Sequence, residues 1–212
     1  APDSADFKGP IQRTLNLDDS KNRHRTLTRQ LGQKLHFEPR RRQDVDAVLL
    51  LGSPEQARQI SPQLVFHHAG DLPGYSTSHV YSATSNRRLD RDINGLQFCD
   101  MPWVLDNQGN WATPRDTLAA VWPERSKRSP RLFALGFDAY QVIPWLDTLN
   151  LPGFAYFPGA TGVITLRPGK RLHRTLDWAQ FDKGVPRKLS GKPNTLSMEG
   201  QHESTQSGGR PR

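Results

Sequence analysis

The sequence lacks the features on which several classes of protein depend. Its 212 residues include one cysteine, Cys99, which excludes an internal disulfide and any multi-cysteine zinc or iron–sulfur site. No apolar run approaches the roughly 20 residues that a membrane-spanning helix needs. The first residues, Ala1–Gly9, contain no hydrophobic segment typical of a secretion signal. Because the chain also begins without methionine, we expect a processed or truncated portion of a longer protein.

Residue patterns for covalent chemistry are also missing. Ser78 and His79, near Asp71, supply the residue types of a hydrolytic triad, but no Gly-x-Ser-x-Gly elbow is present. As strand neighbours, this serine and histidine would also face opposite sides. His67 and His68 are adjacent, so they make a poor chelating pair on a regular element. We therefore expect no catalytic residue, no metal site and no cofactor.

One charged segment contains two acidic residues that resemble a carboxylate pair. Asp90 and Asp92 lie among Arg87, Arg88 and Arg91, in a stretch with few apolar residues. Exposed ion pairs explain this composition better than a pair of catalytic carboxylates. The segment is therefore predicted to be a charged surface loop.

The net charge of the chain is strongly basic, at +8 with a pI near 10.0. Such a charge allows binding to nucleic acid, to anionic lipid or to an acidic protein surface. The basic residues are not interleaved with aromatic residues in the way that single-strand binding requires, so we expect no nucleic-acid partner. Binding to an anionic polymer through Arg40–Arg42 and the basic helix before them remains a third hypothesis.

Strand-like and helical patterns alternate from residue 46 onward. Asp46–Leu51 is a short apolar run typical of a strand covered on both faces. Ser53 then predicts a helix N-cap, and Pro62 should bend or shorten that helix. Further strands are predicted at Tyr75–Ser82 and Gly95–Cys99. This alternation favours an α/β fold with a Rossmann-like layered sheet, in which binding groups collect at the ends of strands.

Other stretches complete the predicted secondary structure. Further helices are predicted at Ile11–Phe37, Thr113–Trp122 and Arg131–Leu149, and hairpin strands at Val163–Leu166 and Arg171–Phe181. Pro144 should interrupt the last of these helices. Residues 1–185 should then form the folded portion. Residues 186–212 contain almost no large apolar side chain, so we predict a disordered basic tail there.

Several ordered strings of residues resemble one known protein family. They are FHHAGDLPGYSTSHVYS, DRDINGLQFCDMPWVLD, LFALGFDAYQVIPWL and GATGVITLRPGKRLHRTLDWAQF. Together they resemble the C-terminal domain of the LppC/LpoA lipoproteins, which activate a class A penicillin-binding protein. The resemblance covers about Asp6–Val185.

The resemblance implies both a fold and a function. The implied fold is type I periplasmic-binding-protein-like, with two α/β lobes of which this chain is a part. The implied function is non-catalytic: binding and activation of a class A penicillin-binding protein of the 1A type, with peptidoglycan as a further candidate contact. The implied location is the periplasm, attached to the outer membrane, with membrane contact only through a lipid anchor outside this segment.

Solute-binding relatives of this fold hold a ligand between their lobes, contacted by residues at strand ends. The positions that best fit such a location are Ser53, Tyr81, Ser82, Asp100 and Asp138. The alternative hypothesis is therefore a periplasmic solute-binding module for a cell-wall fragment or other small polar ligand. Against it, the bulky residues Met101–Trp103 could fill the cleft themselves.

Overall fold

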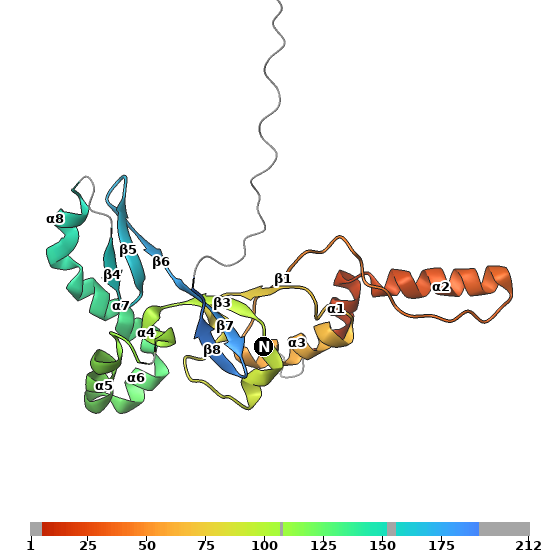
Figure 1. Ribbon diagram of the computed structural model, residues 1–212, viewed down its shortest axis with the longest axis horizontal. Coiled ribbons are helices and arrows are strands. Elements are labelled where there is room, and N and C mark those ends of the chain that lie inside the picture. Colours follow the sequence, from red (N-terminus) through yellow and green to blue (C-terminus); the bar gives the residue numbers. More distant parts are fainter. Residues whose placement is uncertain (1–5, 107, 152–155, 191–212) are drawn as a thin grey trace, which may run out of the picture.

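The computed structural model describes residues 6–106, 108–151 and 156–190, and contains two β-sheets. The larger sheet has the strand order β1-β2-β3-β7-β8, and the smaller has the order β4-β5-β6. Figure 1 shows the larger sheet near the centre of the molecule and the smaller sheet to its left. The strands of the larger sheet are β1 (Val48–Leu50), β2 (Gly74–Ser76), β3 (Gln97–Asp100), β7 (Asp177–Asp182) and β8 (Val185–Lys188). Those of the smaller sheet are β4 (Phe157–Gly159), β5 (Gly162–Arg167) and β6 (Arg171–Thr175).

Strands β1, β2 and β3 run parallel, β7 pairs antiparallel with β3, and β8 pairs antiparallel with β7. The predicted α/β arrangement is therefore confirmed, but the second strand is shorter than expected. It ends at Ser76 and is followed by a short 3₁₀ helix, η1 (Ser78–Val80). Val80 and Tyr81 are both buried, and consecutive residues of a strand cannot both face one side. The helical turn lets both side chains enter the core.

Helix α3 (Pro54–Phe66) connects β1 to β2 and begins as predicted. The Ser53 hydroxyl accepts a hydrogen bond from the Gln56 backbone N–H, and the Gln56 side chain accepts one from the Ser53 N–H, which together form a capping box. Pro62 lies inside the helix, which nevertheless continues to Phe66. Pro62 therefore does not shorten this helix, and the bend that we gave as the other possibility stays a prediction.

The charged segment between β2 and β3 is not a freely exposed loop. It contains η2 (Leu89–Ile93), and Asp90 within it is buried. Asp90 Oδ1 accepts hydrogen bonds from Arg58 Nε at 3.0 Å and Nη2 at 2.7 Å, and Oδ2 accepts one from the Asn86 backbone N–H. The prediction that Asp90 belongs to an exposed ion-pair cluster was wrong, because its partner comes from α3 instead of the neighbouring arginines.

The N-terminal region forms two helices where one was predicted. Helix α1 (Lys8–Thr14) and helix α2 (Leu17–Leu31) are separated by Asn16, whose left-handed backbone (φ 54°) interrupts the helix. Gly32, also left-handed, ends α2. Figure 1 shows α2 projecting from the rest of the molecule.

Helices fill the segment between β3 and the smaller sheet. The predicted helix at Thr113–Trp122 corresponds to α5, and the predicted helix at Arg131–Leu149 is interrupted near Pro144, as expected. The elements are α4 (Pro102–Leu105), α5 (Ala112–Val121), α6 (Pro123–Arg128), α7 (Pro130–Gln141), η3 (Ile143–Trp145) and α8 (Leu146–Leu149).

The C-terminal strands correct two boundaries. We predicted one strand over Arg171–Phe181, but the chain leaves the smaller sheet after Thr175 and enters the larger sheet at Asp177. Each half finds a different partner, β5 or β3, which the local pattern does not encode. Strand β8 extends to Lys188, so the regular structure continues past the boundary that we predicted at residue 185. Residues 191–212, most of the predicted tail, lie outside the described residues.

The main core packs residues of the larger sheet against helices α3, α4 and α7. Aromatic rings of Tyr81, Phe98 and Phe181 meet there, with the last two stacked at a centroid distance of 4.9 Å. Buried Trp103 and Ala160 belong to the same cluster. Because Ala160 lies in the turn between β4 and β5, this core packs that turn of the smaller sheet together with residues of the larger sheet.

Candidate functional site

An ion pair joins the carboxyl end of β3 to the start of α7. Arg131 donates from Nε to Asp100 Oδ1 at 3.0 Å and from Nη2 to Oδ2 at 2.5 Å. The same Nη2 lies within hydrogen-bond distance of the backbone carbonyls of Ser78 and Tyr81. Asp100 is fully buried, and its Oδ1 also accepts the Met101 N–H. The carboxylate therefore acts as an internal anchor for α7.

Tyr81 sits beside this ion pair, but its ring points into the core. Ring contacts with Phe98 and Phe181 hold it there, and the side chain is 5% exposed. Burial, followed by the nearby charges of Asp90 and Asp100, raises the pKa of Tyr81 to about 12. The phenol is thus neutral at physiological pH and offers no base to a ligand.

Asp138 forms a second anchor, from the middle of α7 to the turn between β4 and β5. Its carboxylate accepts hydrogen bonds from the backbone N–H groups of Ala160 and Thr161, both at 2.7 Å, and from the Thr161 hydroxyl at 2.6 Å. All three donors are buried with it. Gly159 allows this approach, because a Cβ at that position would lie 2.5 Å from Asp138 Oδ2.

The two serines proposed from the sequence serve local structure. Ser53 caps α3, as described above. Ser82 is exposed, and its hydroxyl donates to the Thr84 carbonyl at 3.0 Å. Neither hydroxyl has a described contact with the Asp100 or Asp138 anchor.

The structure thus brings together only part of the predicted set. Asp100 and Tyr81 meet through Arg131, whereas Asp138 contacts the smaller sheet. Trp103 lies between these two anchors: it is buried against Trp111 and Phe137, and its backbone N–H donates to the Ala160 carbonyl at 2.9 Å. The polar groups at this end of the larger sheet are therefore used to join the two sheets.

Sequence reasoning missed Arg131 and Arg58, which pair with the buried carboxylates of Asp100 and Asp90. For Arg131 a signal was present. A cation in the first turn of a helix is disfavoured by the helix dipole, so an arginine directly after Pro130 indicates a specific partner elsewhere. Arg58 carries no such signal, because it lies in the middle of α3.

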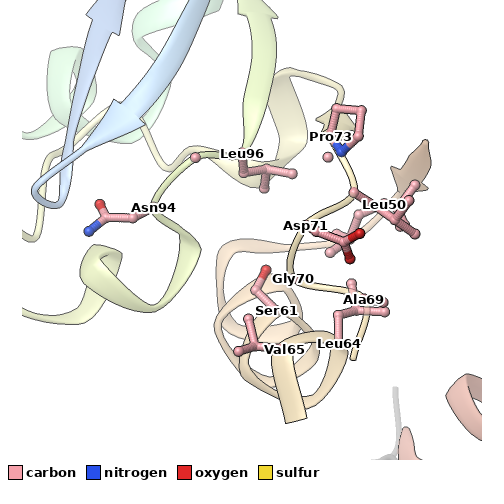
Figure 2. Close-up of a pocket in the computed structure, with 14 residues that line it drawn as sticks. Leu50, Ser61, Leu64, Val65, Ala69, Gly70, Asp71, Pro73, Asn94 and Leu96 are labelled. Atoms are coloured by element: carbon pink, nitrogen blue, oxygen red, sulfur yellow. The ribbon is translucent and has the colours of Figure 1, made fainter. Parts of the chain in front are cut away.

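A hollow of about 290 Å³ lies at the opposite, amino ends of the parallel strands. Figure 2 shows Leu50, Asp71 and Asn94 among the residues that surround it. Two of its polar side chains already have partners: Asp71 accepts a hydrogen bond from Arg41 at 2.7 Å, and Asn94 Oδ1 accepts one from the Gly184 N–H at 2.9 Å. This hollow therefore presents few free polar groups, and none of the five predicted positions lines it.

An apolar groove of about 640 Å³ lies between α5 and α7. Its walls include Leu118, Val121 and Trp122 on one side and Leu132 and Phe133 on the other. Such a groove suits hydrophobic contact more than recognition of a small polar ligand.

Two other kinds of site are absent from the described ranges. These residues contain no group of three or more His, Cys, Asp or Glu side chains placed to share a metal ion. Among their helices, none combines the length and apolar character needed to cross a bilayer.

Residues 2–184 match the family model described as "LppC putative lipoprotein". The chain is 28% identical over 178 residues to the penicillin-binding protein activator LpoA of Vibrio cholerae. It is 29% identical over 175 residues to the activator of the same name from Photobacterium profundum. These alignments cover 82% and 81% of this chain but 29% and 28% of the relatives. The chain therefore spans under a third of the length of these curated relatives.

Solved structures show the same similarity at the level of the fold. The LpoA (YraM) C-domain from Haemophilus influenzae, described as a regulator of PBP1A, superposes with a TM-score of 0.57 at 21% identity. The match covers 78% of this chain and 49% of that domain. Full-length LpoA from the same organism gives a TM-score of 0.58 at 22% identity, over 69% of this chain and 27% of that protein. The mixed α/β fold expected from the resemblance is confirmed by this likeness.

Proposed function

Because the chain belongs to the LppC family of lipoproteins, we propose that it is the regulatory portion of a protein that binds and activates a class A penicillin-binding protein of the 1A type. The observation that carries the proposal is the alignment along most of this chain with relatives named penicillin-binding protein activators. The similarity is not confined to one motif, because the family model matches residues 2–184.

The proposed activation requires binding alone. A regulator shifts its partner towards the active state when it binds that state more tightly than the inactive one. Asp100 and Asp138 support a non-catalytic role, because both carboxylates are buried and hydrogen-bonded within the fold. A buried, fully bonded carboxylate is poorly placed to act on a substrate.

The proposed location follows from the family description. A lipoprotein is held at a membrane surface by its lipid, and a partner that builds peptidoglycan works in the periplasm. We place the protein in the periplasm, attached to the outer membrane through a lipid outside this segment, with peptidoglycan as a further candidate contact. The name of the matching family model supports this location.

The solute-binding alternative is less well supported. A polar ligand between lobes would need hydrogen-bonding groups that face it, but Ser53 and Asp100 bond within the fold, and the Tyr81 side chain is in the core. A ligand at these positions would have to displace existing bonds, each of which contributes about 1 kcal/mol or more.

The test is a binding and activity assay with the cognate synthase. The purified 212-residue chain is immobilised and exposed to the soluble part of a class A penicillin-binding protein, with a class B penicillin-binding protein as the control. We expect saturable binding of the class A enzyme and an increase in its peptide cross-linking rate. Equal retention of both enzymes, or none of either, would contradict the proposal.

A further inference from the structure

Helix α2 and the segment that returns beside it, residues 17–41, form a projection that we call the arm (Figure 1). Within the helix, only Leu17 and Ser20 are buried. Helices in proteins usually gain their stability from a packed apolar face, so a 15-residue helix with so little burial is unusual. Its surface is available to a partner.

The arm is nevertheless held in a defined direction. The Arg40 N–H donates to the Ser20 hydroxyl at 3.2 Å. At the base, the Arg42 N–H donates to the Leu15 carbonyl at 3.0 Å. Farther out, the rings of His24 and Phe37 stack at 4.3 Å. A surface fixed in this way loses less conformational entropy when it binds.

Much of the positive charge of the protein lies on this arm. Residues 17–41 contain seven Lys or Arg and three Asp or Glu side chains, a formal charge of +4 out of +8 for the whole sequence. Some of these charges are paired, as Lys21 is with Asp18 and Arg41 with Asp71. The exposed side chains of Arg23, Arg25, Arg29 and Lys34 have no acidic partner in the part of the chain that the structure describes.

Two leucines add an apolar component. Leu27 and Leu31 are 49% and 59% exposed and, being four residues apart, share one face of the helix. Arg25 and Arg29 share another face for the same reason. A partner that covers the arm must therefore offer both apolar surface and carboxylates.

A protein groove fits this combination better than a charged polymer does. Arg40 also has no acidic partner among the described residues, so four of the five unpaired cations of the arm are arginines, whose planar guanidinium matches a carboxylate with two hydrogen bonds. Arginine is also enriched and lysine depleted in protein interfaces. An anionic polymer would need the charges but would gain little from Leu27 and Leu31. Amphipathic helices are commonly bound by laying their apolar face into a groove.

We propose that the arm is the surface by which this protein docks into an acidic groove with an apolar floor on its penicillin-binding protein partner. The inference rests on the proposed function and adds the contact face to it. The observations that support it are the unpaired arginines, the exposed leucines and the fixed direction of the arm.

The test compares charge reversal on the arm with charge reversal elsewhere. The affinity of the wild-type chain for the soluble synthase is measured by calorimetry at several salt concentrations. The variant Arg25→Glu/Arg29→Glu should bind roughly tenfold more weakly or worse, with a shallower dependence of affinity on salt. The matched control, Arg125→Glu/Arg128→Glu, makes the same charge change on exposed residues of α6 and should bind as the wild type does.

Two further variants test the contribution of charge separately from that of apolar contact. Arg25→Lys/Arg29→Lys keeps the charge and should retain most of the salt dependence. Leu27→Ser/Leu31→Ser should weaken binding while leaving the salt dependence unchanged. Because these side chains are exposed, all variants should keep the thermal midpoint of the wild type, which circular dichroism checks.

The possible outcomes distinguish the two proposals. If the wild-type chain does not bind the synthase, the proposed function and the docking surface both fail. If the wild type binds and the two charge reversals lose affinity equally, or neither does, the function stands and the arm is not the docking surface. If the arm variant loses affinity for isolated peptidoglycan but keeps it for the synthase, the arm contacts a polymer and the inference is wrong.

Discussion

Asp100 and Arg131 connect elements that are 31 residues apart in the sequence. The Asp100 side chain is fully buried, while the Arg131 side chain is 29% exposed. Burying a charge is unfavourable unless its hydrogen bonds are complete, and Asp100 meets this condition through Arg131 and the Met101 N–H. Removing one partner should therefore cost far more than removing an exposed ion pair.

This difference can be measured with two matched variants. Asp100→Asn should lower the free energy of unfolding by about 3 kcal/mol, because Arg131 would then lose its charged partner. Asp182→Asn breaks the exposed pair with Arg187, joined at 2.8 Å, and should change it by less than about 1 kcal/mol. Urea denaturation gives both values. Similar losses in the two variants would show that the Asp100 pair is no more important than a surface contact.

At the residue scale, the sequence indicates which carboxylates are important better than it indicates the residues with which they form hydrogen bonds. Asp100 and Asp138 were predicted as ligand contacts, whereas in the structure both carboxylates are buried and hydrogen-bonded within the fold. Asp90 was assigned to the surface because arginines surround it in the sequence, but its partner, Arg58, lies 32 residues away. Local composition does not contain contacts over such distances.

Helix α7 contacts both sheets and is the element that joins them. Its first turn binds β3 through Arg131, and its middle binds the β4–β5 turn through Asp138. The helix was predicted correctly from its apolar spacing, including the break near Pro144. Its two anchors could not be predicted, since they depend on where β3 and the β4–β5 turn lie in space.

Two glycines near α7 should respond in opposite ways to the same substitution. Gly159→Ala should destabilise the fold by about 2 kcal/mol, because Asp138 is held by three hydrogen bonds and cannot move away from the new Cβ. Gly136 lies in α7, and a Cβ added there would meet no atom within 4 Å apart from its chain neighbours and the backbone of its own helix, so Gly136→Ala should stabilise by about 0.5–1 kcal/mol. Thermal unfolding of both variants checks the prediction, and a loss of stability in both would contradict it.

The strands β6 and β7 show that the alternation of residues along a strand does not reveal which strand it pairs with. Their combined stretch resembles one long strand, because alternation continues through it. The division at Leu176 arises from the partners, β5 on one side and β3 on the other. The same limit applies to β8, which forms only by pairing with β7.

The stability of the whole molecule should depend on pH through His67. This residue, at the end of α3, is buried, and its pKa is lowered by burial and then by the charges of Lys21, Lys8 and His68. The unfolded state therefore binds a proton at a higher pH than the folded state does. Between the lowered pKa and the ordinary value of 6.5, stability rises with pH, and it is lost as the pH falls.

The measurement is the free energy of unfolding between about pH 7.5 and 5.5, where histidine titrates. The wild type should lose stability across this range with a slope of no more than about 1.4 kcal/mol per pH unit from this residue. The variant His67→Gln should show a shallower slope, whereas His36→Gln, at an exposed position, should behave as the wild type. Identical slopes in all three proteins would exclude His67 as the cause.

At the scale of the molecule, the α/β class and the family were predictable, because they depend on ordered strings and on the alternation of elements. The projection of α2 was not. Its leucines predicted a helix with one apolar stripe, and such a stripe normally packs against a core. Here Leu27 and Leu31 remain exposed, since the described neighbours cover only the base of the helix.

The chain passes between the two sheets at two places, through Met101 after β3 and through Leu176 before β7. Because Asp100 pairs with Asp177 across the strands, these passages lie next to each other. Two adjacent single-chain passages alone would form a hinge, but the Trp103 N–H bond to the Ala160 carbonyl and the α7 anchors at Asp100 and Asp138 hold the two sheets across it. Because the arm extends away from these passages (Figure 1), the same contacts also set the position of its tip, where any change in the angle between the sheets would be largest.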